Sequence, residues 1–437
     1  MSIFENLRPF QVAMYFGFGL LMIIAVILLN TADIGGGTTG PTTGPVAIWG
    51  TLDANAMQAT LAQVREDTGG FRDVTYQQIS PDRFDQMLVD AIVERRPPDI
   101  ILIPQRKLVE HRSKILPINY EFFSQRRLRD EYIDGFEIFA RPNGLYVIPF
   151  VADPLILYWN RDIFASNGLA QPPRTWEDVT GRIVPDVVRR GLDRTVTQSP
   201  IAFGFYENNR NAFASLSMLL LQSGSRMVEE QNGQYRVSLN SALPGGDSAP
   251  LVGVARFYTR FADAGDPLYS WNRNKREDRQ EFLSESLALY FGMGSEFSTI
   301  QRQNPNLNFD VAPVPQAAGA TTPRTYGDFY GFAILQTAPN MNGAYQVAQT
   351  LGNERYTAFA ADRLQMAPGH RSTITQGTGS TLGGVVFNAA LIARGWLNPA
   401  SARTEQAFDQ MVRDIQANRT DPARAASDLQ QRLRQAF

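Results

Sequence analysis

The sequence of 437 residues contains no cysteine. This absence excludes disulfides, thiolate chemistry and metals held by cysteine, and also a lipid anchor attached to an N-terminal cysteine. Histidine is nearly absent too, and the positions of His111 and His370 fit no metal-binding spacing. We therefore predict that the protein holds no metal ion.

Motifs that identify common enzyme classes are missing as well. The sequence has no glycine-rich phosphate loop with lysine, no His-Glu-x-x-His and no Gly-x-Ser-x-Gly. It has 43 acidic residues, but nothing in the sequence pairs two of them as in a glycosidase. The net charge of −2 gives no electrostatic argument for nucleic-acid binding. We therefore predict a binding protein that is not an enzyme, with no cofactor and no nucleic-acid partner.

The N-terminal stretch is long, apolar and free of charge. Pro9–Ala32 carries no charged side chain and includes the apolar run Val12–Leu29. Such a run suits a membrane-spanning helix and exceeds the apolar core of most signal peptides. Arg8 before it and Asp33 after it favour a cytoplasmic N-terminus, residues 1–8. We predict an uncleaved signal anchor over residues 9–32, single-pass in the plasma membrane, with the remaining chain on the periplasmic or extracellular side. A cleaved signal peptide and a buried helix of a soluble fold are the alternatives.

A flexible linker is expected after this anchor. Ile34–Pro45 reads IGGGTTGPTTGP, and glycine, threonine and proline without apolar periodicity cannot form a core. A flexible chain of this length reaches roughly 20 Å. We therefore predict a linker over residues 33–45 that keeps a folded domain close to the membrane.

The globular part begins at Val46, and its length suggests about two or three domains. Apolar spacing predicts strands and helices in alternation, at Val46–Trp49, Ala54–Asp67, Phe71–Ile79, Asp82–Arg96 and Asp99–Ile103. A β-α-β-α-β order is typical of a parallel sheet with crossover helices.

The carboxyl ends of parallel strands are where such sheets bind ligands. Trp49, Thr51 and Asp53 follow the first predicted strand, so we identify them as candidate ligand contacts. The alternative is that Trp49 covers the core and that Asp53 caps the helix beginning at Ala54.

The rest of the chain is organised around Val147–Trp176. Two apolar runs flank Asp153, and an acid in that position is either paired in a core or lines a cleft. The second run begins Pro-Leu-x-Leu-Tyr-x-Asn-x-Asp-x-Phe and is followed by Pro-Pro-x-Thr-Trp. This pattern resembles the interlobe crossing of bacterial extracellular solute-binding proteins of family 1, the maltose-binding-protein-like substrate-binding proteins of ABC transporters.

The resemblance implies an α/β, two-lobe, periplasmic-binding-protein-like fold of type II with an interlobe cleft. It implies a division into lobe I, residues 46–150 plus 310–350, and lobe II, residues 151–309 plus 351–437. Crossing segments are expected near Phe150–Pro154, Asn308–Val314 and Thr350–Tyr356.

The resemblance also implies ligand contacts from both lobes. Besides Trp49, Thr51 and Asp53, the candidates are Asp153, Tyr206, Asn209, Gly294, Ser295, Glu296, Tyr326, Tyr330 and Arg371. Arg371 has a structural role as its alternative, and Glu296 stands where the family often has an aromatic residue.

The implied function is capture of a small polar solute, a carbohydrate, and its delivery to the permease subunits of an ABC importer. A monomer is expected. The same fold could instead bind a peptide, a polyol or a phosphate ester, or serve a sensor or adhesin that transports nothing. An anchored enzyme acting on polysaccharide is the remaining alternative, which no pair of acids supports.

Overall fold

The computed structural model describes residues 43–193, 195–231, 233–241 and 249–437. The expected cytoplasmic segment, the anchor at residues 9–32 and most of the linker lie outside this part. Among the described helices, none combines the length and the apolar character needed to cross a membrane.

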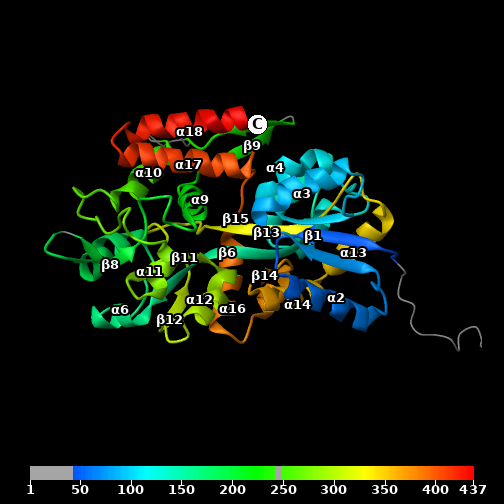
Figure 1. Cartoon of the computed structure of the whole chain (residues 1–437), viewed down its shortest axis with the longest axis horizontal. Helices are drawn as coiled ribbons and strands as arrows, with labels where there is room; N and C mark the ends of the chain where they lie inside the picture. Colours follow the sequence, from blue (N-terminus) through cyan, green and yellow to red (C-terminus); the bar gives the residue numbers. More distant parts are fainter. Residues whose placement is uncertain (1–42, 194, 232, 242–248) are drawn as a thin grey trace, which may run out of the picture.

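Most strands of the described chain join one sheet that runs the length of the molecule (Figure 1). The strands are β1 (Val46–Gly50), β2 (Val74–Gln78), β3 (Ile100–Pro104), β4 (Ala140–Arg141), β5 (Gly144–Leu145), β6 (Ile148–Asn160), β7 (Arg189–Arg190), β8 (Val196–Ile201), β9 (Val228–Gln231), β10 (Gln234–Val237), β11 (Leu287–Met293), β12 (Phe309–Ala312), β13 (Thr325–Ile334), β14 (Ala367–Pro368) and β15 (Ala393–Arg394). The central order is β2-β1-β3-β13-β6-β11-β8-β7; β12 and β14 pair with β6, and β15 pairs with β13.

Helices cover both faces of this sheet. The α-helices are α2 (Ala54–Thr68), α3 (Pro81–Val93), α4 (Leu108–His111), α5 (Gln125–Glu131), α6 (Arg161–Ser166), α7 (Trp176–Asp178), α8 (Val184–Val187), α9 (Ala212–Gln222), α10 (Pro250–Arg260), α11 (Asp278–Leu283), α12 (Phe297–Gln303), α13 (Met341–Leu351), α14 (Glu354–Leu364), α15 (Arg371–Gln376), α16 (Thr381–Ile392), α17 (Ser401–Gln416) and α18 (Pro422–Ala436). Short helical turns are η1 (Gln105–Lys107), η2 (Arg112–Lys114), η3 (Asp134–Phe139), η4 (Val179–Ile183) and η5 (Gly294–Glu296).

The first lobe is built on the predicted β-α-β-α-β unit. Strand β1 pairs in parallel with β2 and with β3, which confirms the parallel order expected from the sequence. All five residues of β3 are buried, as a parallel strand with helices on both faces requires. Figure 1 shows α2 and α14 below this part of the sheet, and α3 and α4 above it.

Strand β6 belongs to both lobes. Its first part, Ile148–Pro154, pairs antiparallel with β13, which also pairs with β3 of the first lobe and packs on α9 of the second. Its second part, Leu155–Trp159, pairs antiparallel with β11, and β12 pairs along the same part from the other side. The segment around Asp153 therefore lies where the chain crosses between the lobes, as the resemblance implied.

The second lobe contains the end of β6, strands β7, β8, β11 and β12, and most later helices. Trp176 stacks on Phe291, and Phe203 packs against both rings within a core of aromatic side chains. Helices α17 and α18 pack on each other and on α10 (Figure 1).

Several elements lie differently from the expected division into lobes. Residues 310–312 of β12, expected in lobe I, pair with the second-lobe end of β6, and β14, expected in lobe II, pairs with its first-lobe part. Helix α14 falls in the range expected for lobe II but packs on α2 of the first lobe, where Arg355 pairs with Asp67 at 2.6 Å. The expected crossing at Thr350–Tyr356 is the turn between α13 and α14, and both helices pack in the first lobe. The amphipathic pattern of a helix shows which face is buried but not which sheet buries it.

Candidate functional site

The junction of the lobes carries an ion pair that joins them. Arg106 lies just beyond the carboxyl end of β3, and its Nη1 is 3.5 Å from Oε1 of Glu405 on α17 of the second lobe. The Nε of Arg106 is 3.5 Å from Oδ2 of Asp328 on β13. The negative charge of Asp328 raises the pKa of Arg106 above its usual value. The guanidinium therefore stays charged and is shared between the two lobes.

A buried glutamine fixes the floor of this junction. The Nε2 of Gln105 donates to the carbonyl of Gly327 at 3.0 Å and to Oδ1 of Asp328 at 3.2 Å. Its Oε1 accepts from the backbone N–H of Phe329 at 2.6 Å. The hydroxyl of Tyr326 donates to Oδ1 of Asp328 at 2.7 Å. Because Gln105 is fully buried, these contacts hold the Asp328 carboxylate in a set position.

Two further tyrosines complete the group. Burial and the charge of Asp328 raise the pKa of Tyr330 above its usual value. Burial and the charge of Glu405 raise the pKa of Tyr206, which also lies within electrostatic reach of Arg106. Tyr206 comes from the second lobe and Tyr330 from β13, so tyrosines approach the junction from both sides. We name this group the interlobe cluster: Arg106, Tyr206, Tyr326, Asp328, Tyr330 and Glu405.

Asp153, Gly294 and Ser295 meet beside the interlobe cluster. The Oδ1 of Asp153 accepts from the backbone N–H of Ser295 at 3.0 Å, and its Oδ2 accepts from the Ser295 hydroxyl at 2.6 Å. Burial raises the pKa of Asp153 to about 7, against the opposing effect of these two hydrogen bonds. A Cβ on Gly294 would lie 3.0 Å from Val386 and 3.4 Å from Asp153, so glycine allows the loop to approach β6 closely. In this structure Asp153 is a buried, paired acid.

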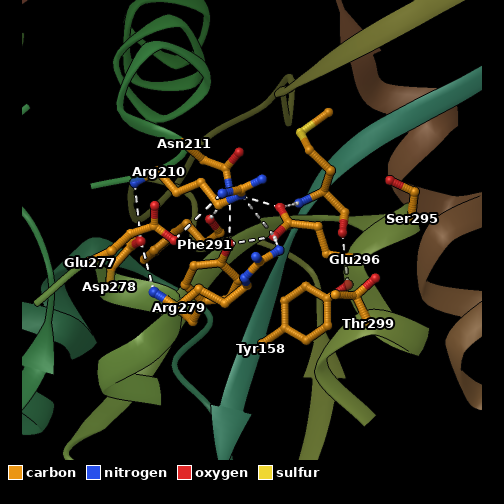
Figure 2. A network of polar contacts seen from close by, with 12 residues as sticks. Tyr158, Arg210, Asn211, Glu277, Asp278, Arg279, Phe291, Ser295, Glu296 and Thr299 are labelled. Atoms are coloured by element: carbon orange, nitrogen blue, oxygen red, sulfur yellow. Dashed lines mark hydrogen bonds and ion pairs between the residues drawn. The ribbon is translucent and has the colours of Figure 1, made fainter. Parts of the chain in front are cut away.

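Glu296 lies at the centre of a polar network in the second lobe (Figure 2). Its Oε1 accepts from the backbone N–H of Met293 at 3.0 Å and from Asn211 at 2.8 Å. Its Oε2 accepts from the Tyr290 hydroxyl at 2.6 Å and from Arg279 at 3.3 Å. With this many partners, the Glu296 side chain holds the Gly294 loop in place.

The remaining predicted contacts lie in three other places. Trp49 and Thr51 are half-buried at the end of β1, and Asp53 caps α2 by accepting from the N–H of Ala56 at 2.9 Å. Asn209 is buried and donates to the carbonyl of Ala202 at 2.8 Å. Arg371 binds Asp134 at 2.7 Å and the carbonyl of Tyr132 at 3.0 Å, outside the interlobe cluster.

The sequence analysis missed half of the interlobe cluster. Arg106 had a usable signal, because it follows β3 as Thr51 follows the first predicted strand. Asp328 also had a signal, because it lies between Tyr326 and Tyr330, which were both proposed as ligand contacts. Glu405 had no signal, because it lies on a helix whose position at the junction depends on tertiary packing.

Comparison with known proteins places this geometry in a known fold. No protein-family model matches the sequence. A protein of Brucella abortus and one of Brucella suis, each named only as a binding protein, are 23% identical to the chain over 238 residues. That match covers 53% of this chain and 53% of each relative, so the chain spans about half the length of the curated relatives it matches.

Solved structures match over nearly the whole chain. A cyclo/maltodextrin-binding protein in complex with maltotetraose superposes with a TM-score of 0.71 at 14% identity, covering 91% of this chain and 98% of that one. The sugar-binding protein MalE of Xanthomonas citri has a TM-score of 0.71 at 16% identity, with coverage of 90% and 97%. The acarbose-binding GacH receptor of Streptomyces glaucescens has a TM-score of 0.69 at 14% identity, with coverage of 90% and 98%.

These similarities define the fold class. The chain has the mixed α/β, two-lobe fold of solute-binding proteins. Its structural neighbours include maltodextrin-binding and other sugar-binding proteins, which are binding proteins rather than enzymes.

Proposed function

We propose that the protein binds a small polar solute, a carbohydrate, between its two lobes and catalyses no reaction. The interlobe cluster is the observation that carries this proposal. It brings two carboxylates, a guanidinium and three tyrosines together where two strand ends and two lobes meet. Charged side chains bind hydroxyls through strong hydrogen bonds, and tyrosine rings pack on the apolar faces of sugars.

The expected mechanism is closure of the lobes about the crossing strands. Strands β6 and β13 connect the lobes, while Arg106 and Glu405 approach the solute from opposite sides. A solute that contacts both lobes binds the closed form better and so increases its population. Hydroxyls of the solute would replace the contacts that Arg106 makes to Glu405 and Asp328.

Membrane attachment and transport form the second part of the proposal. A tether through residues 9–32 would enter the fold at β1, whose first residues lie at the end of the first lobe remote from the junction (Figure 1). An anchor there would leave the junction accessible from outside the membrane. We also propose that the protein delivers the bound sugar to the permease subunits of an ABC importer and acts as a monomer. Both points rest on the resemblance to solute-binding proteins.

A thermal-shift screen over malto-oligosaccharides, mannobiose, monosaccharides, polyols and short peptides tests the proposed ligand class. We expect a saturable rise of the unfolding temperature with one or more sugars, because a ligand that binds only the folded state stabilises it. A response to peptides alone would contradict the carbohydrate assignment and would favour the peptide alternative.

A further inference from the structure

A polar cavity lies between the lobes and shares no residue with the interlobe cluster. Its volume is about 500 Å³, within the range of small-molecule sites. The charged residues that line it are Asp134, Glu137, Arg141, Arg226, Glu230 and Arg394. They come from η3, β4, β9 and β15 and from the turn before β9. We name it the arginine cavity.

The first carboxylate of the arginine cavity is shared by two guanidiniums. Oδ1 of Asp134 accepts from Arg371 at 2.7 Å, and Oδ2 accepts from Arg394 at 2.6 Å. Both guanidiniums lower the pKa of Asp134 against the opposing effect of its burial. The single Asp134 carboxylate therefore pairs with two guanidiniums.

The second carboxylate is shared in the same way. Glu230 is nearly buried and lies 3.1 Å from Nη1 of Arg112 and 3.2 Å from Nη1 of Arg141. Of the other two lining charges, Arg226 pairs with Glu229 at 3.2 Å, and Glu137 is exposed. Counting the lining residues and their ion-pair partners, guanidiniums outnumber carboxylates around the cavity.

Arg394 and Arg141 are both held by partners, Asp134 and two backbone carbonyls for Arg394 and Glu230 and one backbone carbonyl for Arg141, but each has one unfavourable feature. Burial lowers the pKa of Arg394, and the nearby positive charge of Arg324 lowers it further. The Nε of Arg141 is buried and has no hydrogen-bond partner among the described residues. A buried donor without an acceptor is costly, and an anion that reached it would remove that cost.

We propose that the arginine cavity binds a small organic anion through a carboxylate or phosphate group. Arg141 and Arg394 donate to the anionic oxygens, since planar guanidiniums bind both groups with strong, charge-assisted hydrogen bonds. The apolar lining side chains of Leu221, Met227 and Trp396 contact the carbon part of the ligand. The site shares no residue with the interlobe cluster, although Arg394 on β15 pairs with Tyr326 of the cluster on β13.

Thermal unfolding of the full chain in mild detergent tests the site, with inorganic phosphate and citrate as probes and KCl keeping the ionic strength constant. We expect a saturable rise of the unfolding temperature with at least one of the two, and none with KCl alone. Phosphate alone would identify a phosphate ligand, and citrate alone a carboxylate ligand. In R394Q the affinity should fall about tenfold or more, the effect of losing one charged hydrogen bond.

Three further variants separate binding from damage to the fold. R394K keeps the positive charge and should retain most of the response, whereas R260Q, which removes an arginine paired with Asp266 on the second lobe, should respond like the wild type. If R394Q does not fold, R226Q removes an exposed lining cation and should also weaken the response. The proposal is overturned if neither anion stabilises the wild type beyond KCl, or if the folded arginine variant responds as strongly as the wild type.

Discussion

Asp153 illustrates what a single residue contributes at the crossing. It lies on the strand that both lobes share, is almost fully buried, and binds only the backbone and hydroxyl of Ser295 among the described residues. The sequence predicted that an acid between two apolar runs is either paired in a core or lines a cleft. The structure shows the paired form, while the Asp328 and Glu296 charges lie close enough to raise its pKa further.

Asp153→Asn should reduce the pH dependence of stability. Because its pKa is raised from 3.8 to about 7 in the fold, the folded protein binds this proton more tightly than the unfolded chain does. The contribution of Asp153 to stability is therefore greatest below pH 4, declines as the pH rises to about 7, and stays constant above that. Asparagine keeps both contacts, accepting from the Ser295 N–H and donating to its hydroxyl.

Urea unfolding measures this effect. The free energy of unfolding should differ less between pH 5 and pH 8 in the variant than in the wild type. Asp130→Asn, on an exposed helix, is the control, and an equal pH difference in D153N and D130N would contradict this account.

Glu296→Gln should destabilise the second lobe. The substitution removes a carboxylate that accepts from Asn211, Tyr290 and Arg279, and it leaves Arg279 without its charge partner. The loss should be about 1–3 kcal/mol, the usual cost of breaking a buried, charged hydrogen-bond network. Chemical denaturation measures it, and a value within error of the wild type would show that the network is not structural.

At the level of elements, strands β6 and β13 approach each other unusually closely within the first lobe. Strand β13 passes β6 with a register shift between Tyr330 and Gly331. A Cβ on Gly331 would lie 2.3 Å from the carbonyl oxygen of Ile148, so only glycine allows the two backbones to come this close.

Gly331→Ala should therefore be strongly destabilising, because β13 or β6 must move to accommodate the methyl group. Gly181→Ala is the matched control, since no atom lies within 4 Å of the Cβ that it would add. Thermal unfolding of both variants should show a melting temperature below that of the wild type for G331A only. An unchanged melting temperature for G331A would contradict the close packing of these strands.

The ion pair between Arg106 and Glu405 connects η1 of the first lobe to α17 of the second. Their side chains are 30% and 42% exposed, so solvent weakens the attraction. A double-mutant cycle with R106Q and E405Q should give a coupling of roughly 0.5–1 kcal/mol at low salt, decreasing as salt screens the charges. No measurable coupling at low salt would mean that the pair does not hold the lobes together.

Local patterns explain why the first lobe and the crossing could be predicted. Residues 46–104 alternate between strand and helix periods within short windows, and the apolar runs around Asp153 are contiguous in sequence. Contacts between distant segments produce no such local pattern in the sequence. The insertion of β13 between β3 and β6, the packing of α14 on α2, and the approach of Glu405 to Arg106 depend on tertiary contacts between segments far apart in the chain.

At the scale of the whole molecule, one continuous sheet connects two lobes with polar side chains gathered at their junction. The interlobe cluster draws residues from segments between η1 and α17, so it exists only in the folded chain. The arginine cavity is a second place where both lobes meet, and it uses other residues. The proposed sugar and the proposed anion can therefore be tested in separate variants.

Calorimetric titration with the sugar that gives the largest thermal shift tests the central claim most directly. The wild type should bind it with one site and a dissociation constant in the micromolar range, about −8 kcal/mol. Asp328→Asn should weaken binding about tenfold or more, through the loss of one charged contact, while the exposed control Asp130→Asn should bind like the wild type. Undiminished sugar binding by D328N, or no binding of any carbohydrate by the wild type, would contradict the account.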